Sequence, residues 1–292
     1  MNPAAPSTAG PHRVSASVKR ILFLYLCGVT ISLQATSLIE WMVDLSAVWQ
    51  VKAPIVLLAG PLAVAFLGYL LFPPSRHDVP PLVWSLNAVV MTVFWGGGYV
   101  LAGVLTYGGD FMSLEIPLDR QIPFTPEWIF VYLTVYFVFL MPLFYLEDRR
   151  RLVTLDLAQV LSLAFSYTMF LYCPVAIDRP TVEPLDFATW TVAVVQGNDP
   201  AWNCFPSTHC VACTVAALAM LESNWKAGYW ILLSTVAICI STVMTKQHFV
   251  LDAAAGVLLG VSFFFLAKVI VATAGDRLGR LLGPDWGAKQ NA

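Results

Sequence analysis

About eight stretches of roughly 20 mostly apolar residues follow one another along this chain of 292 residues. A helix needs about 20 such residues to cross roughly 30 Å of hydrocarbon. With 58% hydrophobic and only 12% charged residues, the chain carries more apolar surface than a soluble domain of this length buries. The predicted spans are residues 20–41, 53–72, 81–107, 127–146, 153–177, 207–222, 227–245 and 249–272.

The apolar runs lack the alternation of apolar and polar residues that marks the strands of a membrane barrel. Only helices and closed barrels satisfy every backbone group in lipid. We therefore expect an all-α fold: a polytopic membrane helical bundle with about eight transmembrane helices.

The spans divide the chain into parts. Residues 20–79 supply two N-terminal helices, and residues 80–273 supply a six-helix core. Residues 1–19, rich in Ala, Pro and Ser, are expected to be a disordered tail, and residues 274–292 a second tail. The first apolar run could be a signal peptide, but it is long and has no convincing small-residue cleavage site, which favours an uncleaved span.

The basic residues fall unevenly on the two sides of an eight-span chain. With both termini on one side, twelve of the sixteen Lys and Arg residues lie there, and Lys52, Arg120, Arg179 and Lys246 lie opposite. By the positive-inside rule, the termini and both tails are cytoplasmic. The other side is the periplasmic, extracellular or lumenal face.

His248 and Asp252 are four residues apart where the last apolar run begins. On a helix, residues at this spacing share a face, so the carboxylate can orient the imidazole and stabilise its charge. An imidazole held in this way can attack phosphorus and form a phosphohistidine. The alternative is a histidine that bonds the nearby Asp for structure alone.

His209 follows Pro206 and Ser207 where the sixth apolar run begins. The free N–H groups and the dipole of a helix N-terminus favour an anion such as phosphate. A histidine there can protonate a leaving alkoxide and then deprotonate an incoming alcohol or water. Taken alone, the same residues would describe a proline-started helix with a satisfied histidine.

Two cations lie in the loops that should join these histidines on the outer face. Arg179 precedes Pro180 just after the fifth run, and Lys246 lies two residues before His248. Arg can bind phosphate with two hydrogen bonds, and Lys acts as a point charge. Either cation taken alone would be interpreted as a residue at the membrane interface, near the lipid headgroups. Gly256 and Gly260 form a small-xxx-small pair that predicts a close helix contact.

In order and spacing these residues resemble the type 2 phosphatidic acid phosphatase superfamily, whose motif blocks read KxxxxxxRP, PSxH and SRxxxxxHxxxD. The resemblance covers roughly residues 80–272. The matching positions are Arg179, Pro180, Pro206, Ser207, His209, Ser241, His248 and Asp252. Two usual cations are absent, because Tyr172 and Thr242 stand at the lysine and arginine positions; Lys246 is a candidate replacement.

The resemblance implies a role for each matching residue. His248 would be the nucleophile, Asp252 its partner and His209 the acid and base, while Arg179 and Ser207 would bind phosphate. It implies no metal ion and no other cofactor. The sequences around these motifs and at residues 119–126 are similar to the branch that includes inositol phosphorylceramide synthases. Arg120 could touch a headgroup or anchor its loop, and Tyr172 could line the pocket or pack.

Fewer cations suit a phosphodiester, which carries one negative charge, better than a monoester, which approaches two. We therefore expect phosphoryl transfer on a membrane phospholipid or lipid phosphate, either as a headgroup phosphotransferase with a lipid alcohol acceptor or as a lipid phosphate phosphatase acting on phosphatidate or an isoprenoid diphosphate. No nucleic-acid partner is expected, and the sequence predicts no oligomeric state.

Two other classes stay open at this point. The fold could serve a non-enzymatic transporter or scaffold in which the histidines relay protons or pack. A metal-dependent alcohol phosphotransferase is disfavoured, because the chain lacks the dense Asp and Gly cluster that its metals need.

Overall fold

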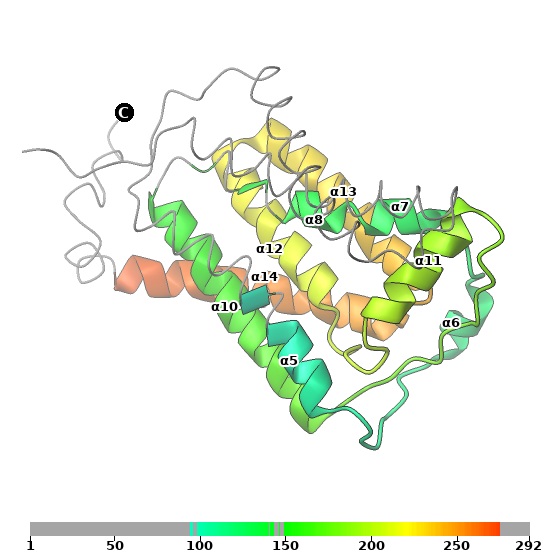
Figure 1. Cartoon of the computed structure of the whole chain (residues 1–292). Helices are drawn as coiled ribbons and strands as arrows, with labels where there is room; N and C mark the ends of the chain where they lie inside the picture. The colour runs from blue at the N-terminus through cyan, green and yellow to red at the C-terminus, as the bar shows by residue number, and fades with distance from the viewer. Residues whose placement is uncertain (1–93, 96–97, 140, 143–145, 147–148, 275–292) are drawn as a thin grey trace, which may run out of the picture.

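The computed structural model describes residues 94, 95, 98–139, 141, 142, 146 and 149–274 (Figure 1). The two N-terminal helices predicted over residues 20–79 lie outside the described residues, as do the tail 1–19 and all but the first residue of the tail 274–292. The described helices are α5 (Gly98–Leu105), α6 (Pro117–Gln121), η3 (Pro126–Trp128), α7 (Ile129–Tyr132), α8 (Val135–Val138), α10 (Arg149–Tyr172), α11 (Phe187–Asn198), α12 (Thr208–Ser223), α13 (Trp225–Met244) and α14 (Val250–Thr273).

The described part of the chain is helical, with no strand beyond isolated bridges that join Met112 to Val175 and Val175 to Asn203. Among the described residues, three helices are long and apolar enough to cross a membrane: Arg150–Tyr172, Trp225–Met244 and Val250–Thr273, with mean hydropathies of 1.4, 1.8 and 2.3. These findings support a membrane protein of the all-α class. The count of about eight spans stays a prediction.

Helix α12 lies at the centre of the bundle, between α10, α13 and α14 (Figure 1). Its residues Thr208–Ala217 are all buried, although the helix includes a histidine, threonines and cysteines. The Gln159 side chain of α10 donates to the carbonyl of Ala212 at 3.0 Å, which ties a buried amide into the packing of α10 on α12. The polar side chains of α12 are thus shielded by the three helices packed around it.

The small residues of α14 make the close contact that their spacing predicts. A Cβ on Gly256 would lie 2.5 Å from the Ser207 carbonyl oxygen and 2.9 Å from Cys210 Cβ, and one on Gly260 would lie 2.9 Å from Thr214 Cβ. Helix α14 therefore touches the backbone of α12 at its first turn, beside Ser207. This contact sets how far the two motif-bearing helices stand apart.

Two segments differ from the sequence prediction. The fourth predicted span, 127–146, begins as the short pieces η3, α7 and α8 instead of one helix, and the Thr134 hydroxyl donates to the Val131 carbonyl at 2.6 Å, where it competes with the backbone ladder. Helix α11 was not predicted, because its twelve residues are too few to cross a bilayer. Its start carries a recognisable signal, since Asp186 caps the Thr189 N–H at 2.8 Å.

The contact at Gly256 leads to a stability prediction. Gly256→Ala should lower the free energy of unfolding by about 1–3 kcal/mol, the usual range for overpacking, because the added methyl group would overlap the α12 backbone. Thermal unfolding of the detergent-purified protein measures this. The matched control is Gly197→Ala in α11, where a Cβ meets nothing within 4 Å; an equal loss in both variants would contradict the close contact.

Candidate active site

Three loops hold the backbone in front of the first turn of α12. The Met112 N–H donates to the Pro174 carbonyl at 3.0 Å, the Ile177 N–H donates to Ala201 at 3.0 Å, and the Cys204 N–H donates to Val175 at 3.2 Å. These bonds fix the loop that runs from Asp199 to Cys204. The Cys204 carbonyl, which points toward the third motif, is therefore held in place.

The turn between α13 and α14 places His248. Lys246 adopts a left-handed φ of 53°. The Lys246 N–H bonds the Val243 carbonyl at 3.1 Å and the Gln247 N–H bonds Thr242 at 2.9 Å, which is the Schellman pattern of a helix end. The His248 N–H also reaches Thr242, at 3.0 Å. Glycine usually takes the left-handed position, so a lysine there suggests that its side chain has a use.

Asp252 connects the two motifs. Its Oδ2 accepts the Phe249 N–H at 2.8 Å and so caps α14, while its backbone carbonyl accepts the Ser207 N–H at 3.1 Å. Oδ2 also lies 3.6 Å from His248 Nδ1. Asp252 is fully buried, so its charge acts in a poorly screened environment.

The neighbours of His248 determine which ring nitrogen carries the proton. Nδ1 lies 3.0 Å from the Cys204 carbonyl oxygen and 3.6 Å from the Asp252 carboxylate, and both are acceptors. Nδ1 must therefore be the N–H donor. In the neutral ring this leaves the lone pair on Nε2, which faces His209 Nδ1 at 3.4 Å.

His209 stands between His248 and a tyrosine that the sequence motifs do not include. Its Nε2 lies 2.8 Å from the hydroxyl of Tyr132, at the end of α7. The hydroxyl can accept from Nε2–H, which leaves Nδ1 free to gain and lose a proton. Tyr132 therefore suits a histidine that cycles between acid and base, and Trp95 closes another side of the ring by an edge contact.

The two imidazoles are suited to share one proton. Burial by itself would lower the pKa of His248, but Asp252 and Cys204 beside the ring raise it to about 10. At neutral pH the His248 ring is then protonated, and its Nε2–H points at His209 Nδ1. Transfer of that proton would create a neutral nucleophile and a protonated acid in one step, so the proton belongs to the pair.

The N-terminus of α12 offers donors for an anion. Ser207 caps the helix through its hydroxyl, which accepts the Cys210 N–H at 3.5 Å. The Thr208 hydroxyl is buried and has no hydrogen-bond partner among the described residues. A phosphate oxygen at the helix N-terminus would supply an acceptor for it. Sequence reasoning missed Thr208 because the PSxH motif leaves that position variable.

Arg179 reaches the same region, but it already has a partner. Its Nη1 donates to the Asp199 carbonyl at 2.6 Å and its Nη2 lies 2.9 Å from the Asp199 carboxylate. The Tyr99 hydroxyl donates to the other carboxylate oxygen of Asp199. The charges of Arg179 and Asp199 both act on His209. The motifs give no signal for Asp199, which lies twenty residues after its partner.

The other three candidate residues lie apart from the two histidines. The Lys246 ammonium donates at 2.7 Å to each of two carbonyls, those of Asp119 and Ile122, and so holds α6. Arg120 pairs with the exposed Glu115 at 2.8 Å. Tyr172 ends α10 with 81% of its surface exposed. The phosphate-binding and pocket roles of these three residues stay predictions.

A metal ion has one candidate position in the described part of the chain. Ligand atoms of Cys204, His248 and Asp252 lie within 4.8 Å of one another. The donor set of sulfur, nitrogen and oxygen could suit zinc, but His248 Nδ1 would have to exchange its bond to the Cys204 carbonyl for the metal. A chelator treatment tests this alternative below.

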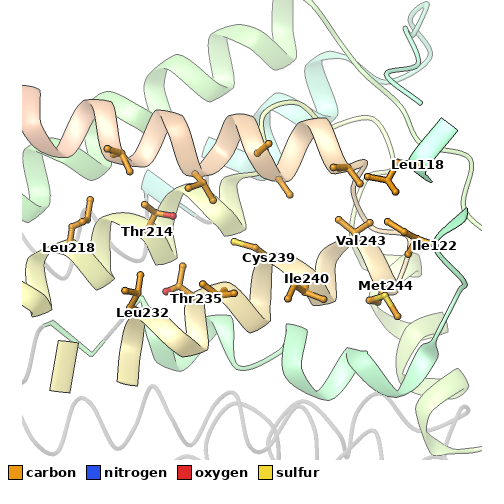
Figure 2. Close-up of a pocket in the computed structure, with 16 residues that line it drawn as sticks. Leu118, Ile122, Thr214, Leu218, Leu232, Thr235, Cys239, Ile240, Val243 and Met244 are labelled. Carbon is orange, nitrogen blue, oxygen red and sulfur yellow. The ribbon is translucent and has the colours of Figure 1, made fainter. Parts of the chain in front are cut away.

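An apolar groove of about 580 Å³ lies between α13 and α14, floored by α12 (Figure 2). It extends from Leu118 and Ile122 near α6 to Leu218 and Leu232 at the other end. Neither histidine nor Asp252 lines it. The groove is therefore distinct from the place where the two imidazoles meet, and in a bilayer its apolar wall would contact lipid chains.

Comparison with known families covers the part of the chain that carries these residues. Residues 153–276 match the family model of the PAP2 superfamily. The matched segment includes Arg179, both histidines and Asp252, and the match supports the superfamily that the motif blocks indicate. No curated protein and no solved structure matches the chain.

The shared proton leads to a titration prediction. Asp252→Asn should lower the pKa of His248, because the carboxylate that stabilises the imidazolium is removed. The check is a histidine NMR titration of the ¹⁵N-labelled protein, in which the His248 ring should lose its proton at lower pH than in the wild type. Glu222→Gln, which removes a carboxylate paired with Lys268, should leave the titration unchanged; an unchanged midpoint in Asp252→Asn would contradict the assigned cause.

Proposed function

We propose that this chain transfers a phosphoryl-containing group between membrane lipids, or from a lipid to water, through a covalent phosphohistidine on His248. The observation that carries the proposal is the pair of imidazoles, with His248 Nε2 at 3.4 Å from His209 Nδ1 and His248 Nδ1 held by the Cys204 carbonyl. A purely structural histidine would not need its second nitrogen aimed at another titratable ring. The superfamily match of residues 153–276 supports lipid phosphatase or phosphotransferase chemistry.

The first step would form the intermediate. His248 passes its Nε2 proton to His209, and the freed lone pair attacks phosphorus. The N–P bond forms while the P–O bond to the departing lipid alcohol breaks. Its electron pair goes to the departing oxygen, which takes the proton from His209. Asp252 stabilises the positive charge that the phosphorylated ring carries on its Nδ1 side.

The second step would return the pair to its first state. His209, now neutral, takes the proton of the acceptor hydroxyl. The new O–P bond forms as the N–P bond breaks, and the electron pair of that bond returns to Nε2. His209 then passes the proton it took from the acceptor back to His248 Nε2. Tyr132 stays hydrogen-bonded to His209 in both steps, because its hydroxyl accepts from Nε2–H whether or not Nδ1 carries a proton.

Phosphate oxygens would be held at the first turn of α12. Ser207 and Thr208 supply hydroxyls, the helix supplies its N-terminal dipole, and Arg179 supplies charge from the neighbouring loop. By the positive-inside argument, this end of the bundle faces the periplasm, the cell exterior or a lumen. The substrate is then a phospholipid of the outer leaflet.

The acceptor separates two forms of the proposal. A lipid alcohol would make the chain a headgroup phosphotransferase similar to inositol phosphorylceramide synthases, and water would make it a lipid phosphate phosphatase. The absence of the two usual motif cations, at Tyr172 and Thr242, favours a singly charged diester as donor. A scaffold would need neither Tyr132 nor the shared proton, and a transporter that relays protons through the histidines would release no phosphorylated product.

The proposal predicts loss of turnover in His248→Ala. Purified protein would be assayed with lipid monophosphates, isoprenoid diphosphates and phospholipid diesters, with and without a diacylglycerol or ceramide acceptor. We expect the variant to lose at least a thousandfold in turnover, because the nucleophile is gone. His77→Ala, a histidine outside the motifs, is the matched control.

Each result of this assay has a distinct meaning. Phosphate release without an acceptor indicates a phosphatase, and an acceptor-dependent new phospholipid indicates a transferase. Activity that survives His248→Ala would overturn the covalent mechanism. Activity lost after treatment with a chelator and restored by zinc would favour a metal at Cys204, His248 and Asp252. A folded protein with no product from any substrate would refute the enzymatic function.

Tyr132→Phe tests the cycling of His209. Removal of a hydrogen bond to a charged group costs about 1.5–3 kcal/mol, so we expect kcat to fall about tenfold to a hundredfold with little change in KM. The matched control is Tyr229→Phe, an exposed tyrosine of α13, which should keep the wild-type kcat. A Tyr132→Phe variant with wild-type kcat would show that the hydroxyl does not assist His209.

A further inference from the structure

We infer that Asp199 sets the charge that the phosphate subsite accepts and makes it selective for singly charged phosphodiester lipids over doubly charged phosphomonoesters. This inference rests on the proposed function and names the substrate class of the same site. It concerns a residue outside all three motif blocks. The carboxylate lies against Arg179 Nη2 at 2.9 Å, and the side chains of Arg179 and Asp199 are only 9% and 13% exposed.

The position of Asp199 is fixed from three sides. Its backbone N–H bonds the Val195 carbonyl and ends α11, its own carbonyl accepts Arg179 Nη1, and its carboxylate accepts the Tyr99 hydroxyl. The same loop continues to Cys204, whose carbonyl orients His248. The negative charge therefore stands on a rigid part of the site and cannot swing away when a ligand arrives.

The pair also acts on the candidate catalytic groups. Asp199 interacts electrostatically with Tyr132, Tyr136 and His209, from α7, α8 and α12, in addition to Tyr99 on α5. Arg179 still has a donor to offer at Nε, since that N–H is buried and has no partner among the described residues. A phosphate oxygen could bind that N–H while both Nη groups remain on Asp199.

The charges near the histidines leave little attraction for a dianion. Arg179 is paired with Asp199, His248 is paired with Asp252, and the Lys246 ammonium is held by the carbonyls of α6. A second negative charge on the ligand would meet the Asp199 carboxylate in a poorly screened site. A diester brings one charge and avoids that repulsion, which links Asp199 to the choice of donor lipid.

Asp199→Asn tests the inference, because it removes the charge while the amide oxygen still accepts from Arg179 and the amide NH2 can donate to the Tyr99 hydroxyl, which then accepts. Phosphatidate and phosphatidylinositol with the same acyl chains are compared at pH 8. We expect the ratio of kcat/KM for the monoester to kcat/KM for the diester to rise about tenfold over the wild type. Glu222→Gln, which also removes a carboxylate from an ion pair, should leave the ratio unchanged.

A pH comparison adds a readout that a merely structural role would not move. A phosphate monoester loses its second charge below about pH 6. In the wild type the monoester-to-diester ratio should therefore rise between pH 8 and pH 5, and this rise should be smaller in Asp199→Asn. The titration of the histidine pair changes turnover of both substrates in the same way, so its effect cancels in the ratio. The same rise in both proteins would contradict the inference.

A binding experiment decides the matter even without turnover. Thermal unfolding is measured with inorganic phosphate and with dimethyl phosphate at pH 8, where the first is mostly a dianion and the second a monoanion. Inorganic phosphate should raise the unfolding temperature of Asp199→Asn more than that of the wild type. Dimethyl phosphate should raise the unfolding temperatures of both proteins by similar amounts. Suppose that the wild type turns over lipids, but Asp199→Asn changes neither the monoester-to-diester ratio of kcat/KM nor the stabilisation by inorganic phosphate. The inference about Asp199 then fails while the proposed function stands. If no lipid is turned over, the proposed function fails and the binding result still decides the role of Asp199.

Discussion

The geometry of the site depends on one buried carboxylate. Asp252 caps α14 through the Phe249 N–H, faces His248 Nδ1, and accepts the Ser207 N–H with its backbone carbonyl. It thereby links the third motif to the first turn of α12 without any contact to bulk water. A buried carboxylate is tolerated only when it is paired and hydrogen-bonded. The bonds that allow Asp252 to be buried therefore also fix the positions of His248 and of the helix turn that carries His209.

The packing of α14 on α12 brings that carboxylate to its partners. Gly256 lies one turn after Asp252 and touches the Ser207 carbonyl, so the helices meet where the two motifs meet. A larger residue would separate Ser207 from Asp252 and draw His209 away from His248. The close helix packing at the small residues therefore also sets the distances between the candidate catalytic residues.

Local patterns predicted much of this arrangement. The spacing of His248 and Asp252 predicted that their side chains meet, although His248 lies in the turn before α14 and not on the helix. The apolar runs predicted α10, α12, α13 and α14 to within a few residues. Contacts between distant residues could not be predicted, because no local pattern records them: Tyr132 is 77 positions from His209. Lys246 shows a different difficulty. Its charge suggested a phosphate ligand, but the residue has a left-handed backbone and its ammonium bonds two carbonyls of the α6 region. Those partners depend on where α6 lies, which no local pattern predicts.

The length of α12 has a consequence for how deep the two imidazoles lie. Its 16 residues make a helix about 24 Å long at 1.5 Å per residue, some 6 Å shorter than a typical hydrocarbon layer of about 30 Å. When its far end reaches the opposite interface, the turn that carries His209 lies below the level of the headgroups, unless the bilayer thins around it. A phosphate must then leave part of its hydration shell to reach the imidazoles. The depth of the site would itself discriminate against highly charged headgroups, before any side chain touches them.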